Sequence, residues 1–77
     1  MNTLRDNKNN QYVINHISMI GDVQQDNEET GKYYFDFTCG GVAHTISDYD
    51  QAVVIDFQDK MIELVTEYIS PTYTMIV

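Results

Sequence analysis

The 77-residue sequence has a single cysteine, a single proline, no tryptophan and no long apolar run. Because Cys39 is alone, the chain cannot form an internal disulfide, and its N-terminus lacks the charged-then-apolar pattern of a secretion signal. We therefore expect a cytoplasmic protein. The longest apolar run, Ala52–Ile55, is far shorter than the roughly 20 residues that span a bilayer. No membrane partner is expected.

Positive charge is also scarce. Four Lys and Arg residues stand against twelve Asp and Glu residues, which gives a formal net charge of −8. Nucleic-acid binding needs cationic groups that neutralise phosphates, so we do not expect direct contact with nucleic acid. A negative field of this size steers a protein toward a basic protein surface. The alternative is that the acidity serves only solubility.

Motifs for catalysis, metals and cofactors are missing. The only soft metal ligands are Cys39, His16 and His44, and they lack the paired spacing of a zinc site. A nucleophilic Cys39–His44 pair would have no helix N-terminus to lower the thiol pKa. No glycine-rich phosphate loop occurs. The sequence therefore predicts no catalytic residues, no metal and no cofactor, and we expect that the protein is not an enzyme.

Residues 47–69 are predicted to form one long amphipathic helix. At about 100° per residue, the apolar side chains fall on one side of this helix. That side carries Val53, Val54, Phe57, Met61, Leu64, Val65, Tyr68 and Ile69. The opposite side carries Ala52, Asp56, Asp59, Glu63 and Glu67. Ser47 or Asp48 is expected to cap the helix, and Ser70-Pro71 to end it.

The segment before the helix carries the clearest hairpin signal. Gly40-Gly41 supplies the positive φ angles of a two-residue turn, which fixes the strand register of residues 32–47. The predicted partners are Cys39 with Val42, Phe37 with His44, and Phe35 with Ile46. These side chains and Tyr33 form an apolar sheet face. The opposite, semi-polar face carries Tyr34, Asp36, Thr38, Ala43, Thr45 and Ser47.

The remaining segments complete an α+β fold. Residues 12–23 are rich in β-branched side chains and predict a strand, either with a bulge near His16 or Gly21 or with an end at Gly21. Residues 24–31 are predicted to be a polar loop at a solvent-exposed tip. We expect an antiparallel sheet of three or four strands with one long helix packed on one face, in the order β-β-β-α.

The two ends of the chain are less patterned. Residues 1–11 are polar and are expected to be an N-terminal tail ahead of a single domain at residues 12–77. Residues 72–77 are interpreted either as a short edge strand or as a tail packed against the core.

The acidic side of the predicted helix is the first candidate for a partner-binding surface. Asp59, Glu63 and Glu67 recur about every 6 Å along a helix axis, a spacing similar to that of successive phosphates on a nucleic-acid strand. Like charges at i and i+4 each cost a few tenths of a kcal/mol, and only Lys60 offers an opposite charge, to Asp56. This repeated cost suggests a functional role, and the alternative is a merely solvated face.

Exposed acids and tyrosines elsewhere extend the candidate surface. The predicted loop contributes Asp26, Glu28 and Glu29. Six tyrosines exceed what so small a core needs, and Tyr34, Tyr49 and Tyr73 are predicted at the surface, with Asp36 beside them. Tyrosine is favoured at interfaces because it combines apolar area with a hydroxyl group. These features fit a surface for a foreign partner and a homodimer interface equally well.

Short length, strong acidity and a hairpin that runs into an amphipathic helix over residues 32–69 resemble the small acidic inhibitors of bacteriophages and mobile elements. The resemblance is greatest to anti-CRISPR proteins that occupy the DNA-binding surface of a CRISPR effector. It covers about half of the chain and includes no diagnostic motif. It implies an inhibitor in the host bacterial cytoplasm that mimics DNA and binds the basic surface of a nucleic-acid-binding enzyme.

Two alternatives remain open. Gly31-Lys32-x-Tyr34 within its acidic context is similar to a stretch in a phage inhibitor of uracil-DNA glycosylase, which also mimics DNA. The alternative from another class is a plain interaction module, either a toxin immunity protein or a prophage accessory protein that dimerises through its sheet. Salt separates these classes, because a phosphate mimic loses affinity steeply as salt is added.

Overall fold

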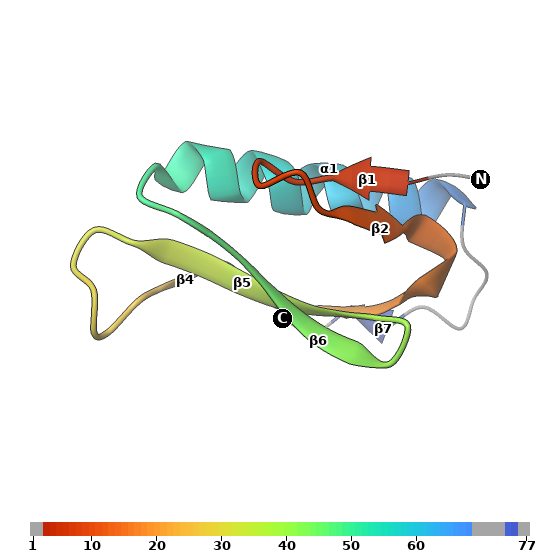
Figure 1. Ribbon diagram of the computed structural model, residues 1–77, viewed down its shortest axis with the longest axis horizontal. Coiled ribbons are helices and arrows are strands. Elements are labelled where there is room, and N and C mark those ends of the chain that lie inside the picture. The colour runs from red at the N-terminus through yellow and green to blue at the C-terminus, as the bar shows by residue number, and fades with distance from the viewer. Residues whose placement is uncertain (1–2, 69–73, 76–77) are drawn as a thin grey trace.

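Strands β5 (Tyr33–Cys39) and β6 (Val42–Asp48) form the hairpin at the centre of the fold (Figure 1). The computed structural model describes residues 3–68 and 74–75. Gly40 and Gly41 have φ angles of 62° and 79°, as a two-residue hairpin turn requires. The predicted register is confirmed over all seven pairs, and no bulge interrupts them.

The other edge of β5 is shared by two short strands. β3 (Ile17–Ile20) and β4 (Gln24–Gln25) both pair antiparallel with β5, and the Gly21 N–H between them donates to the Asp36 carbonyl at 2.7 Å. β7 (Thr74–Met75) pairs parallel with β3 on the far side. The edge strand predicted within residues 72–77 is thus present at Thr74–Met75, and the rest of that segment lies outside the described residues.

The strand predicted over residues 12–23 is not continuous in the structure. β2 (Gln11–Val13) leads into a 3₁₀ helix (Ile14–His16), and the register of β3 against β5 shifts between Ile17 and Met19. The expected irregularity near His16 is therefore present, and the strand also breaks at Gly21. The buried side chains of this segment are Tyr12, Ile14, Ile17 and Ile20. Strict alternation could not bury all four, because they include residues of both parities.

The N-terminal segment differs from the predicted tail at residues 1–11. β1 (Thr3–Arg5) pairs antiparallel with β2, and Leu4 lies opposite Tyr12 with both side chains buried. β1 is only three residues long and lies within a polar segment, so the sequence pattern of this hairpin is weak. Tertiary packing of Leu4 and Tyr12 orders it instead.

A buried carboxylate holds the turn between β1 and β2. Asp6 is 8% exposed, and its Oδ1 accepts hydrogen bonds at 2.9 Å from the backbone N–H groups of Lys8 and Asn10. Its Oδ2 accepts from the Asn10 side-chain amide at 3.1 Å and from the Tyr12 hydroxyl at 2.9 Å. Burial alone would raise the pKa of Asp6, but these hydrogen bonds lower the pKa below its ordinary value. The carboxylate is therefore charged and fully bonded at neutral pH.

The Tyr12 hydroxyl provides a pH-dependent contribution to stability. Burial, followed by the hydrogen bond to Asp6 and its charge, raises the pKa of Tyr12 from 10.0 to about 12. The raised pKa means that the folded state keeps this proton longer than the unfolded state. We expect its contribution to be complete below pH 10 and to be lost as the pH rises to 12, by up to about 3 kcal/mol. Chemical denaturation at stepped pH measures this loss.

The matched control is Tyr12→Phe, which keeps the ring in the core and removes the titrating group. The variant should be less stable at pH 8 by about 1 kcal/mol, because the hydrogen bond to Asp6 is lost. Above pH 10 it should lose less stability than the wild type. An equal alkaline loss in both proteins would contradict this role of the hydroxyl.

The one α-helix among the described residues, α1 (Gln51–Tyr68), begins later than the predicted start at residue 47. β6 continues through Asp48, so the predicted caps Ser47 and Asp48 are strand residues. Asp50 caps the helix instead, since its Oδ1 accepts from the Ala52 N–H at 3.0 Å. Asp48 supports this cap by accepting from the Asp50 N–H at 2.8 Å. Residues 69–71, including the predicted Ser70-Pro71 stop, lie outside the described residues.

The molecule has two layers, with the sheet in one and α1 beside the β1–β2 hairpin in the other (Figure 1). The core lies between them, and Phe35 at its centre is fully buried with its ring 5.9 Å from that of Phe37 and 6.4 Å from that of Phe57. The buried core side chains are Leu4, Tyr12, Ile14, Ile17, Ile20, Phe35, Phe37, Ile46, Val54, Met61 and Val65. The predicted α+β class, with one helix on one face of an antiparallel sheet, is confirmed. None of the described helical segments has the length and apolar character to cross a membrane.

Candidate partner-binding surfaces

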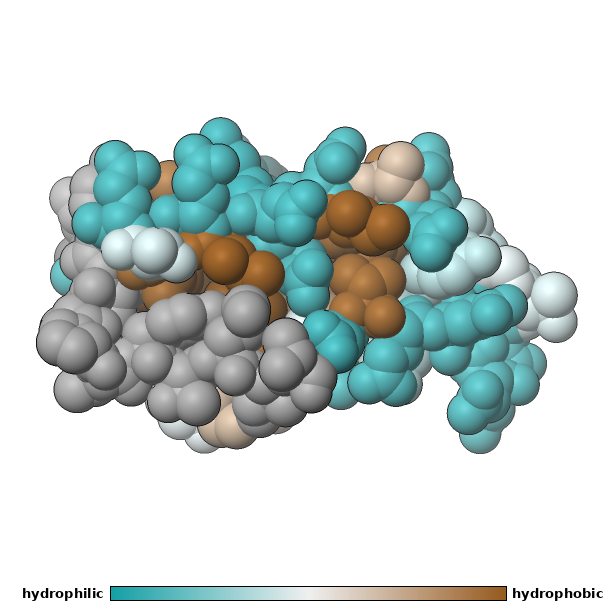
Figure 2. All heavy atoms as spheres, turned by 180° about the vertical axis from the view of Figure 1, so that it is seen from behind, coloured by the Kyte–Doolittle hydropathy of each residue, from teal (hydrophilic) through white to brown (hydrophobic). Residues whose placement is uncertain are grey.

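The first surface is a row of carboxylates on α1, which we call the helix stripe. It consists of Asp56, Asp59, Glu63 and Glu67, and all four residues are exposed. They lie on the side of the helix opposite the buried Val54, Met61 and Val65. Figure 2 shows hydrophilic side chains along the upper edge of the molecule, where α1 runs in Figure 1. The predicted acidic side of the helix is therefore a solvent-facing row.

The carboxylates of the helix stripe have no ionic partner in the described part of the chain. Within residues 3–68 and 74–75 the one ion pair joins Lys32 Nζ and Glu29 Oε1 at 3.7 Å. The Asp56–Lys60 pair suggested by the i, i+4 spacing is not formed. Arg5 and Lys60 line the same hollow as Asp56, whereas Asp59, Glu63 and Glu67 form no described ion pair and face solvent, where a cationic group from outside can reach them.

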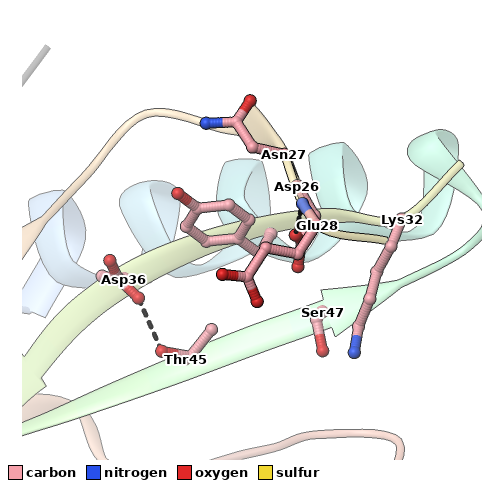
Figure 3. Close-up of a pocket in the computed structure, with 8 residues that line it drawn as sticks. Asp26, Asn27, Glu28, Lys32, Asp36, Thr45 and Ser47 are labelled. Carbon is pink, nitrogen blue, oxygen red and sulfur yellow. Dashed lines mark hydrogen bonds between the residues drawn. The ribbon is translucent and has the colours of Figure 1, made fainter. Parts of the chain in front are cut away.

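The second surface is a hollow of about 370 Å³ on the other face of the sheet (Figure 3). Strand alternation explains its floor, since Asp36 of β5 lies opposite Thr45 of β6 and both side chains point away from α1. Figure 3 shows these side chains and Glu28 in front of the sheet, with α1 behind it. Its lining is Asp26, Asn27, Glu28, Lys32, Tyr34, Asp36, Thr45 and Ser47.

Several acids of the hollow are already bonded within the chain. Asp36 accepts a hydrogen bond from the Thr45 hydroxyl at 2.5 Å. Asp26 Oδ1 accepts from the backbone N–H groups of Glu28 and Glu29 at 2.8 and 3.1 Å, which shapes the loop. Glu29 pairs with Lys32, a residue of opposite charge inside the hollow. Because Lys32 lies among Asp26, Glu28 and Asp36, the hollow is less strongly acidic than the helix stripe, although its loop was predicted as an acidic patch.

Two of the three predicted surface tyrosines lie among the described residues, and their environments differ. Tyr34 is half-buried and its hydroxyl donates to Gln24 Oε1 at 3.3 Å. Tyr49 is 61% exposed, and Lys32 Nζ lies 5.9 Å from its ring centroid. Tyr34 thus forms part of the hollow, and Tyr49 offers free ring surface beside it. Tyr73 lies outside the described residues.

The structure divides the predicted acidic surface into two. The sequence interpretation combined the helix stripe with Asp26, Glu28 and Glu29, but the stripe faces away from the sheet on one side and the hollow opens on the other. Asp26, Glu28, Tyr34 and Asp36 do come together, because β4 and β5 carry the loop over the outer sheet face. Alternation had placed Thr45 and Ser47 on that same face. Their part in the hollow was missed because the fold of the loop is not apparent from sequence.

The histidine and cysteine side chains, which are the candidate ligands for a soft metal ion, do not form a metal site among the described residues. His16, Cys39 and His44 line a separate hollow, of about 390 Å³, yet no described group of three or more His, Cys, Asp and Glu side chains is placed to hold a metal ion. The His44 ring stacks on Phe37 at a centroid distance of 5.4 Å. The Cys39 thiol lies 3.7 Å from the Val13 carbonyl, and burial raises its pKa, so the reactive thiolate is a minor form near neutral pH.

Comparison with known proteins does not assign either surface. No protein-family model, curated protein or solved structure matches the chain. The two surfaces differ in chemistry, since the helix stripe consists of exposed acids and the hollow has a mixed polar lining.

Proposed function

We propose that the protein is a non-enzymatic inhibitor that blocks the nucleic-acid-binding surface of a host defence nuclease by presenting the helix stripe in place of DNA phosphates. The observation that supports this most directly is the row of four exposed carboxylates with no ionic partner among the described residues. Successive carboxylates at i, i+4 positions rise about 6 Å along the helix. Such a row fits a channel lined by arginine and lysine.

The mechanism is competitive occlusion. A net charge of −8 accelerates encounter with a basic surface, and the stripe then occupies the positions where phosphates bind. Arginine binds a carboxylate through two parallel N–H bonds, as it binds a phosphate, and burial of such pairs slows dissociation. No bond is made or broken in this process, and no cofactor is required.

The hollow has a supporting role in this proposal. It lies on the opposite face of the sheet, so one flat basic surface cannot contact both the hollow and the helix stripe. Asp26, Glu28 and Asp36 add to the long-range negative field, while the contact itself is made by α1.

Competition experiments test the proposed function with defined enzymes. Binding of double-stranded DNA by purified CRISPR effector nucleases, and by uracil-DNA glycosylase as the alternative target, is measured with increasing amounts of this protein. For its target, we expect DNA binding to fall with added inhibitor and to recover with excess DNA. The affinity of the inhibitor should fall by roughly tenfold or more from low to high salt.

A binding partner whose affinity changes with neither salt nor competing DNA would contradict the DNA-mimic mechanism and favour an immunity protein. Inhibition of uracil-DNA glycosylase alone would contradict a defence nuclease as the target. A neutral small protein of similar size serves as the control for nonspecific effects on the enzymes.

A further inference from the structure

β6 forms an open edge of the sheet in the described structure. It pairs with β5 along seven residues, and no strand among residues 3–68 and 74–75 pairs with its other side. Figure 1 shows β6 on the side of the sheet nearest the viewer. The opposite edge differs, since β7 covers β3, and β4 is only two residues long. The long unpaired edge of the sheet is therefore β6.

This edge lacks the usual features that prevent strands from pairing. Soluble proteins protect edge strands with proline, lysine, bulges or very short strands. β6 contains none of these features, because its sequence is VAHTISD and its register against β5 is unbroken. Its only charged residue is Asp48, at one end. Val42 at the other end is 57% exposed.

The turn geometry shows which backbone groups of β6 point outward. In a two-residue hairpin the residues that flank the turn exchange both hydrogen bonds, so Cys39 and Val42 are such a pair. Bonding then alternates along the strand, and the N–H and C=O groups of Ala43, Thr45 and Ser47 point away from β5. These three residues present a regular row of donors and acceptors to a neighbouring strand.

We propose that a second copy of this chain pairs antiparallel with β6 through a two-fold axis at Thr45. In this register Thr45 faces Thr45 of the partner subunit, and Ala43 faces Ser47 of the partner subunit. The three outward-pointing residues of each copy then exchange hydrogen bonds with the other copy. The register also pairs all seven residues of β6, which a shifted register does not.

This register places no like charges opposite each other, although each copy carries a net charge of −8. The one acid of β6, Asp48, lies opposite Val42 of the partner subunit, so no like charges face each other. The nearest acid on the outer sheet face is Asp36, which lies opposite Thr45 within each copy. The two Asp36 residues would be three strand spacings apart, about 14 Å, beyond the Debye length of about 8 Å at physiological salt.

The proposed dimer does not depend on the proposed function. The pairing surface is the edge of the sheet, whereas the helix stripe lies on the outer side of α1. Dimerisation therefore leaves the stripe exposed in both copies. A failure of DNA mimicry would leave the dimer unaffected, and a monomeric protein would leave the mimicry unaffected.

Cysteine crosslinking tests the register. Both variants are made in a Cys39→Ser background, and each is incubated under mild oxidation. Thr45→Cys places two thiols on residues about 5.5 Å apart at the axis, within the range of a disulfide. The matched control is Ala43→Cys, on the same strand and face, whose two copies are about 14 Å apart in this register and cannot be bridged.

We expect at least a tenfold larger disulfide-linked dimer fraction for Thr45→Cys than for Ala43→Cys. Equal fractions would overturn the proposed register. Hydrogen exchange on the wild-type chain provides a second readout that needs no substitution. The amides of Ala43, Thr45 and Ser47 should become protected as concentration rises, together with a dimer mass by light scattering. A monomer mass and concentration-independent exchange at the crosslinking concentration would overturn the dimer itself.

Discussion

Phe35→Ala should lower the free energy of unfolding by about 3 to 5 kcal/mol. Phe35 is fully buried, and its ring packs between the sheet and α1, within 6.4 Å of the Phe57 ring centroid. A protein of this length has a total stability of roughly 4 to 11 kcal/mol, so this one substitution removes a large part of it. Urea denaturation followed by circular dichroism measures the change.

The control substitution is Val42→Ala, which also removes apolar atoms from the inner side of the same hairpin. Val42 is 57% exposed, so its loss should change stability by no more than about 0.5 kcal/mol. If Phe35→Ala were as mild as Val42→Ala, the two-layer core centred on Phe35 would be incorrect.

The double substitution Asp59→Lys with Glu63→Lys should weaken inhibition of the target nuclease by roughly 100-fold or more. Each change removes a carboxylate from the helix stripe and places a cation against a basic channel. The same variant should be at least as stable as the wild type. Glu63→Lys turns the repulsion between positions 63 and 67 into an attraction, and the net charge of the chain falls from −8 to −4, while positions 59 and 63 still carry like charges. Inhibition should therefore fall without a loss of stability.

The matched control is Glu28→Lys with Asp36→Lys, which changes the net charge by the same amount on the other face of the sheet. It should reduce inhibition far less than the helix variant, and chiefly by slowing association. Equal losses for the two variants would show that net charge alone matters. Unchanged inhibition by the helix variant would refute the helix stripe as the contact surface.

The central hairpin and the acidic side of the helix could be predicted because their signals are local. Gly40-Gly41 admits few turn geometries, so the register of β5 and β6 followed directly from the sequence. The 3.6-residue period likewise placed Asp59 and Glu63 opposite Val54 and Met61. In both cases neighbouring residues in the chain determine the structure.

The N-terminal hairpin was not predicted because its stability comes from distant contacts. Leu4 and Tyr12 are ordered by packing on the core, and the Tyr12 ring lies 4.9 Å from that of Phe37. Asp6 appears in sequence as an ordinary polar residue of a tail. Its burial and four hydrogen bonds become evident only when the turn is folded.

The sequence also could not show that the helix stripe and the hollow lie on opposite sides of the molecule. Asp26 and Glu28 meet Asp36 because the chain from β4 to β5 folds over the outer sheet face. The same topology places α1 on the inner face. The periodicity of a sequence shows on which side of a single helix or strand an acid lies. It does not show how two such elements are oriented relative to each other in the fold.

The tight Gly40-Gly41 turn also bears on the order in which the sheet assembles. Closing a two-residue loop costs little chain entropy, and hairpins of this kind form in about 1 to 10 μs. By contrast, β3 and β7 bring together Met19 and Thr74, which are 55 positions apart. We expect the sheet to grow outward from β5 and β6 and to add β7 last. Substitutions in the turn would then slow folding, whereas substitutions in β7 would mainly speed unfolding.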